Sequence, residues 1–155
     1  MPPNASTATG SGSFILNDAQ TILTVSNLVF SGLTAGVTGA HIHCCVPAGT
    51  NAPVRIDFIA AGFPTGVTSG SYGHTFTLAT DVSGITVSAF LTGLLSGQAY
   101  VNIHDPGTNP AGGTFAGGEI RAQLVGGVSD VPEPGSVVLM ALSLAGLAAL
   151  RFRSH

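Results

Sequence analysis

Two of the five histidines and both cysteines of this chain are crowded into one short stretch, Ala40–Cys45, which reads "AHIHCC". His41 and His43 alternate along a predicted strand, and residues two apart in a strand point to the same face. Imidazoles paired in this way are good ligands for copper or zinc. A third histidine, His104, ends the later run "AYVNIH". We predict a mononuclear Cu or Zn site at these three histidines; the alternative is that the rings bind loop backbone and fix the strand ends.

Two further residues are weaker candidates for this site. His74 lies in "SYGHTF", where no motif supports it. Cys45 would share the face of His41 and His43 if the strand continues, and a thiolate there would be a soft ligand for Cu(I). Cys44 would point the opposite way, and we expect it to be buried as a small apolar side chain. A disulfide between these neighbouring cysteines is the alternative in an oxidising compartment.

The histidine stretches belong to an internal repeat. The pattern Gly-Leu-x-x-Gly-x-x-x-x-x-Ile-His begins at Gly32 and again at Gly93, 61 residues later, so His104 is the counterpart of His43. Asn102 is the counterpart of His41. We interpret each unit as a strand, a glycine-marked turn and a second strand, and we expect equivalent hairpins in the two halves of a sandwich.

The elements that must position these residues are strands. The chain is rich in Gly, Thr, Ser and Val, and short apolar runs alternate with turn residues, which is typical of an all-β domain. We expect an immunoglobulin-like or Greek-key β-sandwich or barrel, with a hairpin turn at residues 17–20 and no helix before residue 135. About eight strands are predicted, near residues 12–17, 21–30, 38–45, 54–60, 72–79, 85–91, 98–104 and 118–125.

Composition excludes several function classes. Only 7% of residues are charged and the net charge is -3, so no basic patch for nucleic acid is present. The sequence contains no phosphate-binding loop before a helix and no nucleophile elbow. We therefore expect a protein that is not an enzyme.

The C-terminal part differs from the rest. A Gly/Pro-containing linker, residues 126–134, is followed by sixteen uncharged residues, 135–150, and then by Arg151 and Arg153. The run is slightly shorter than the roughly 20 residues of a comfortable helical span, and basic residues after it indicate a cytoplasmic end. We divide the chain into a disordered segment 1–11, a β-domain 12–125, this linker, and a short hydrophobic helix with its basic end, 135–155.

Three motifs of the β-domain resemble the CHRD family, named after chordin: Ala40-His-Ile-His43, Gly97-Gln-Ala-Tyr-Val-Asn-Ile-His104 and Gly117-Gly-Glu-Ile-Arg-Ala-Gln123. In the last motif Ala122 stands where Gly is commoner. The resemblance implies an immunoglobulin-like β-barrel, and it marks Asn102, Glu119 and Arg121 as motif residues. For the last two we expect a cross-strand ion pair or a cap on the loop after His104.

The tail resembles a PEP-CTERM sorting signal. Its parts are Val131-Pro132-Glu133-Pro134, the hydrophobic run, and Arg151 and Arg153. The resemblance implies an exosortase-type processing enzyme as a partner, anchoring in the inner membrane before processing, and delivery to the cell surface or an exopolysaccharide matrix. Residues 1–6 have neither the basic nor the apolar part of a secretory leader. We therefore expect that the leader is missing from this sequence, through a late start or through loss.

CHRD domains are also distantly similar to copper/zinc superoxide dismutases, which carry His-x-His on a strand and a later histidine before an Ala-Gly-rich stretch. That resemblance implies the alternative function of a copper- or zinc-binding redox protein. A dinuclear site of the dismutase type needs six histidines and an aspartate, so it cannot be built here. In addition, Glu119 falls where those enzymes have an arginine, and an anion there would repel superoxide. A structural, adhesive or ligand-binding role is therefore our first expectation.

Overall fold

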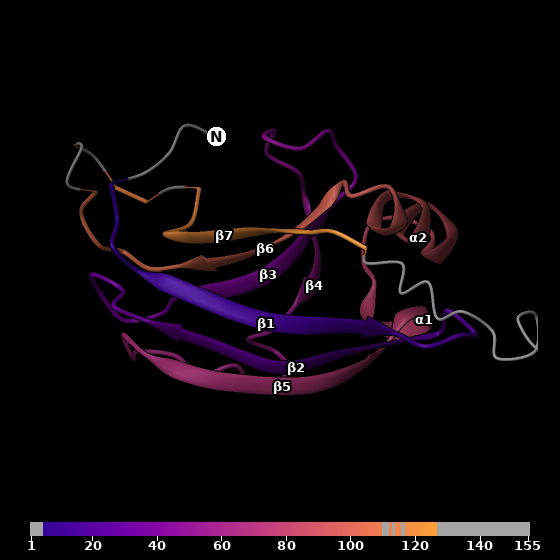
Figure 1. The fold of residues 1–155 in the computed structure, drawn as a ribbon, viewed down its shortest axis with the longest axis horizontal. Coiled ribbons are helices and arrows are strands. Elements are labelled where there is room, and N and C mark those ends of the chain that lie inside the picture. The colour runs from indigo at the N-terminus through magenta and orange to yellow at the C-terminus, as the bar shows by residue number, and fades with distance from the viewer. Residues whose placement is uncertain (1–4, 110–111, 113, 116, 127–155) are drawn as a thin grey trace, which may run out of the picture.

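The protein is a sandwich of two antiparallel sheets, seen in a computed structural model that describes residues 5–109, 112, 114–115 and 117–126 (Figure 1). The three-stranded sheet has the order β1-β2-β5 and the four-stranded sheet the order β4-β3-β6-β7. The strands are β1 (Thr9–Leu16), β2 (Ile22–Ser31), β3 (Gly39–Cys44), β4 (Val54–Asp57), β5 (Gly70–Thr77), β6 (Ala99–His104) and β7 (Ile120–Leu124). The all-β sandwich predicted from the sequence is confirmed, with seven strands in the described residues.

The core lies between the two sheets and follows from alternation along the strands. In β3, Ala40, Ile42 and Cys44 are buried on the inner face, and Ile103 of β6 lies beside them. Aromatic rings from both sheets fill the space between them; Phe58, for example, is fully buried and stacks near Phe76. The inner face of β3 is therefore committed to the core, and its other face is available for a site.

The predicted strand at 85–91 is wrong, as is the expectation that no helix precedes residue 135. Helices α1 (Leu78–Asp81) and α2 (Val87–Leu95) lie between β5 and β6. Thr86 begins α2 as its N-cap, because its hydroxyl accepts a hydrogen bond from the Ala89 amide. Phe90 and Gly93, three residues apart, are the buried residues of α2. A helical spacing of apolar residues was thus mistaken for a short buried strand.

The ends of the β-domain differ slightly from the prediction. The turn at residues 17–20 joins β1 to β2, and the Gln20 amide donates to the Asn17 carbonyl. β1 begins at Thr9, inside the segment for which the sequence predicted disorder.

The predicted hydrophobic helix and its basic end, residues 135–155, lie outside the described residues. Among those that are described, none belongs to a helix long and apolar enough to cross a membrane.

Candidate metal centre

The register of β3 against β6 brings the histidines together. The two strands are antiparallel neighbours, with His41 opposite Asn102, Gly39 opposite His104, and His43 opposite Tyr100. The repeat units therefore meet within one sheet, and the expectation that they lie in two halves of the sandwich is wrong. The units also begin differently, since Gly32 lies just after the end of β2 whereas Gly93 lies inside α2. All three histidines lie on the face of the sheet that is turned away from the core.

The three rings of His41, His43 and His104 form a compact group. The ring centroid of His41 lies 5.6 Å from that of His43 and 5.3 Å from that of His104. The centroids of His43 and His104 are 6.0 Å apart. One ring nitrogen from each residue lies within 4.8 Å of the others. A metal held at about 2.0–2.1 Å by three imidazoles would place their nitrogens roughly 3.3–3.6 Å apart. The rings must therefore close by about an ångström to share one ion.

Each histidine has a buried ring nitrogen without a hydrogen-bond partner. These atoms are Nδ1 of His41, Nε2 of His43 and Nε2 of His104. A buried polar atom left unsatisfied costs about 1–3 kcal/mol, so three of them in one place call for a common partner. A lone pair on each neutral ring can supply a ligand to a metal ion.

The tautomer of His43 is fixed by a backbone carbonyl. Nδ1 of His43 lies 2.8 Å from the Ala52 oxygen. Because a carbonyl only accepts, Nδ1 must carry the proton, and Nε2 is left with a free lone pair. An outer hydrogen bond of this kind is usual for histidines that bind metals. On the other side of the group, Nε2 of His41 lies 3.9 Å from the exposed Asp57 carboxylate.

The loop that carries Ala52 is tied to the sheet by Tyr100 and Arg121. The Ala52 amide donates to the Tyr100 hydroxyl, and the Tyr100 ring stacks parallel to the His43 ring at 4.8 Å. The guanidinium of Arg121 lies 3.4 Å from the centre of the Tyr100 ring and donates to the Thr50 carbonyl. These contacts hold the loop and the His43 ring in place together.

Burial keeps all three rings neutral. Desolvation first, and then the neighbouring His41 and His43, lower the pKa of His104 to about 4 against the opposing effect of Asp105. Desolvation also lowers the pKa of His41, against the attraction of Asp57. The pKa of His43 is lowered mainly by desolvation too. Protons therefore compete little for the ring nitrogens at neutral pH.

A glycine makes room for the rings. A Cβ at Gly39 would lie 3.0 Å from Cε1 of His41 and 3.6 Å from the Cβ of His104. A side chain here would force the two rings aside. The glycine at the start of β3 is therefore part of the site.

The two weaker candidates do not join the group. His74 lies on β5, in the other sheet, where its ring contacts Phe76 at 4.6 Å. Cys45 forms a disulfide with Cys44, so it offers no thiolate, and the prediction of a soft ligand there is wrong. β3 ends at Cys44, and Cys45 has a φ of 119°, so the alternation that would have aimed Cys45 at the histidines stops. The alternative of a vicinal disulfide is the one observed.

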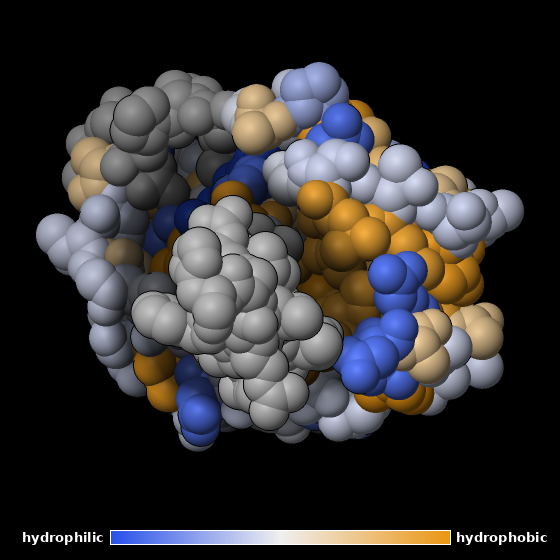
Figure 2. Space-filling view, turned by 45° about the vertical axis from the view of Figure 1, so that its right-hand side comes forward, coloured by the Kyte–Doolittle hydropathy of each residue, from blue (hydrophilic) through white to orange (hydrophobic). Residues whose placement is uncertain are grey.

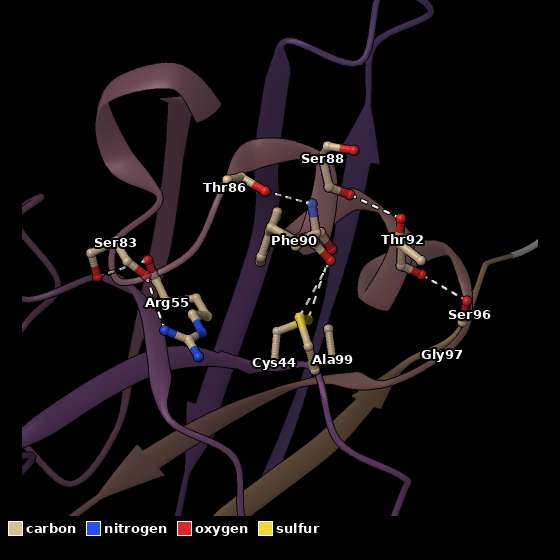
Figure 3. The surroundings of a disulfide bond; sticks show 12 residues. Cys44, Arg55, Ser83, Thr86, Ser88, Phe90, Thr92, Ser96, Gly97 and Ala99 are labelled. Atoms are coloured by element: carbon tan, nitrogen blue, oxygen red, sulfur yellow. Dashed lines mark hydrogen bonds between the residues drawn. A yellow bond between two sulfur atoms is a disulfide. The ribbon is translucent and has the colours of Figure 1, made fainter.

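The disulfide packs against α2 instead (Figure 3). The Cys44 sulfur lies 3.8 Å from the Phe90 carbonyl oxygen. A Cβ at Gly93 would lie only 2.5 Å from both sulfurs, so only glycine allows the helix this close. The disulfide marks the point where the chain leaves β3 for the loop that carries Ala52.

The three motif residues have structural partners. Asn102 donates its amide to the Gly117 carbonyl and so holds the loop that follows β6. Glu119 is buried, and its carboxylate accepts from the Thr34 amide at 3.0 Å and from the Ser6 hydroxyl. Glu119 and Arg121 thus serve two different loops, and the carboxylate is not presented to solvent as a barrier to anions.

Several contributors to the site had no clear signal in the sequence. The Ala52 carbonyl belongs to the backbone, so the type of residue at position 52 gives no indication of its role. Asp57 lies opposite His41 because of the β3–β4 register. Tyr100 stands in a quoted motif, two residues before Asn102, and its position on the face of the histidines could have been read from alternation.

Comparison with known families settles the identity of the domain. The family described as CHRD domain matches residues 1–124. The chain belongs to the CHRD family. No curated protein and no solved structure matches the chain. CHRD domains are structural or binding domains, and the match indicates no catalytic family.

A second family match covers the tail. The PEP-CTERM protein-sorting motif matches residues 130–154, which lie outside the described residues. The motif is a signal recognised by exosortase, and it indicates export with processing at the membrane. This CHRD protein is therefore an exported, surface-associated protein.

Proposed function

We propose that this protein is a structural or adhesive component of the cell surface or exopolysaccharide matrix whose CHRD domain binds one copper or zinc ion. His41, His43 and His104 are the ligands. The observation that carries the proposal is the group of three buried ring nitrogens that have no hydrogen-bond partner. Three neutral imidazoles suit a borderline metal such as Cu or Zn, and a fourth position remains for water or a ligand.

The surroundings of the rings support metal binding over simple hydrogen bonding. If the rings only fixed the strand ends, their inward nitrogens would be expected to bind loop backbone. His43 does bind the Ala52 carbonyl, but through Nδ1, and its buried Nε2 has no hydrogen-bond partner. The ion would join β3 to β6 on the outer face, where no apolar core stabilises the sheet.

The disulfide supports the cellular location. Disulfides persist in oxidising environments outside the cytosol. Cys44 and Cys45 are bonded, in keeping with the export that the sorting motif indicates. An extracellular domain with few charges and a metal between two strands would gain resistance to unfolding where chaperones are absent.

Calorimetric titration of the domain with Zn²⁺ and Cu²⁺ tests the proposal. A chain ending at Gly126 contains every described strand and helix, and its metal should be removed first with a chelator. We expect one ion to bind, and the variants His43→Ala and His104→Ala to lose stoichiometric binding. His74→Ala is the matched control and should bind like the unchanged protein. Absence of binding by the unchanged domain, or equal loss in His74→Ala, contradicts the proposal.

A further inference from the structure

An apolar groove opens at one end of the sandwich. It lies between the end of β1, the end of α2 and the end of β7, and has a volume of about 390 Å³. Figure 2 shows hydrophobic surface with a recess on this side of the molecule. The apolar side chains that line it include Phe14, Leu16, Leu94, Leu95, Leu124 and Val125.

The rim of the groove is unusually exposed. Val125 and Leu95 are 77% and 58% exposed, the two highest values among the exposed large hydrophobic residues of the described chain. No lining residue is charged, and the Gln123 amide is already bound to the carbonyls of Gly97 and Ala99. The groove therefore offers an occupant mainly apolar contact and no charged group.

The groove lies close in sequence to the sorting tail. Gly126 lines the groove and is the last described residue. Residues 127–134 separate it from the uncharged run 135–150, and eight residues span at most about 29 Å when fully extended. Sixteen residues in a helix are about 24 Å long, shorter than a hydrocarbon core of roughly 30 Å. Such a short span draws the flanking chain toward the membrane surface.

We propose that the groove is a lipid-binding surface that takes up acyl chains of the bilayer while the tail is still attached. The inference rests on the membrane segment that the sorting motif implies and is independent of the metal site. Leu95 and Val125 enter the apolar boundary of the bilayer, and the domain lies on the membrane with this end down. Because no charged residue lines the groove, uncharged and zwitterionic lipids serve equally and added salt does not weaken the contact.

Photo-crosslinking of the full chain in phosphatidylcholine vesicles tests this proposal. A diazirine-bearing residue is placed at Leu95 in one variant, at Val125 in a second, and at Val29 in a control. Val29 is 44% exposed, lies on β2 and does not line the groove. We expect adducts with the mass of the phospholipid at positions 95 and 125, several-fold more abundant than at position 29.

Each other outcome overturns the proposal. An adduct to residues 135–150 means that the groove holds the protein's own tail, and an adduct to a second copy means that it is a dimer contact. Lipid adducts no more abundant than at position 29 mean that the groove faces water. If the full chain fails to float with the vesicles at all, the premise of a membrane segment fails, whereas flotation without adducts rejects only the groove.

Discussion

His41 and Asn102 lie directly opposite each other at the centre of the β3–β6 ladder, and they are also counterparts in the 61-residue repeat. The ladder is therefore symmetric about this pair, with Gly39 facing His104 on one side and Tyr100 facing His43 on the other. His43 and His104, equivalent by sequence, flank His41 on one face. The counterpart of His41 in the second repeat unit is Asn102, whose amide donates to the Gly117 carbonyl. Because this position holds an asparagine, the site has three histidines and not four.

We predict that Gly93→Ala destabilises the domain by about 1–3 kcal/mol, because the new methyl group meets both disulfide sulfurs. In an unobstructed helix interior the same change would stabilise by about 1 kcal/mol. Chemical denaturation measures the difference. The penalty should shrink when Cys44 and Cys45 are both replaced by Ala, and a penalty of unchanged size there would refute the contact as its cause.

We predict that Arg121→Ala weakens metal binding about 10- to 100-fold without removing a ligand. Arg121 stacks on Tyr100 and binds the Thr50 carbonyl, so its loss frees the loop that orients His43. Calorimetry measures the affinity. Arg55→Ala is the control, because Arg55 binds the Ser83 carbonyl away from the histidines. Equal effects of the two variants would argue against a positioning role for Arg121.

We predict that the metal-free domain loses stability as the pH falls from about 6.5 to about 4. The pKa of His104 is about 4 in the folded protein and 6.5 for an unperturbed ring. Between these values the unfolded chain binds a proton that the folded chain does not, which favours unfolding. Urea denaturation at several pH values measures the slope. His104→Gln should flatten it, and an unchanged slope in that variant would assign the effect to other groups.

We predict that Glu119→Ala costs about 1–3 kcal/mol, because the half-buried hydrogen bond from the Thr34 amide loses its acceptor. Glu119→Gln keeps an acceptor oxygen and should cost less. Thermal unfolding compares the two. Similar losses in both variants would mean that the charge, not the hydrogen bond, is what the site needs.

Alternation of residues was enough to predict most of the fold. The strands near His43 and His104 were predicted within a few residues, because one face of each is continuously apolar and the other is not. α2 was missed because Phe90 and Gly93 sit in a run too short to separate a helical period from a buried strand. The feature that distinguishes a helix from a strand here is the N-cap at Thr86, which the apolar pattern does not show.

Only those features of the site that follow from residue type and spacing could be predicted. The spacing of His41 and His43 fixed a common face, and the repeat linked His43 to His104. That β3 and β6 are neighbours depended on strand order, which the sequence did not reveal. Cys45 was misplaced because the strand ends one residue earlier, where the disulfide turns the chain. The Ala52 carbonyl acts only through the folded loop.

X-ray absorption spectroscopy of the zinc-loaded domain identifies the atoms that bind the metal, and so tests the three-histidine site itself. We expect a shell of nitrogen and oxygen at about 2.0–2.1 Å with imidazole scattering from three rings. No sulfur is expected in this shell, because both cysteines are in the disulfide. A sulfur shell at about 2.3 Å, or a domain that retains no zinc, would rule out binding by His41, His43 and His104.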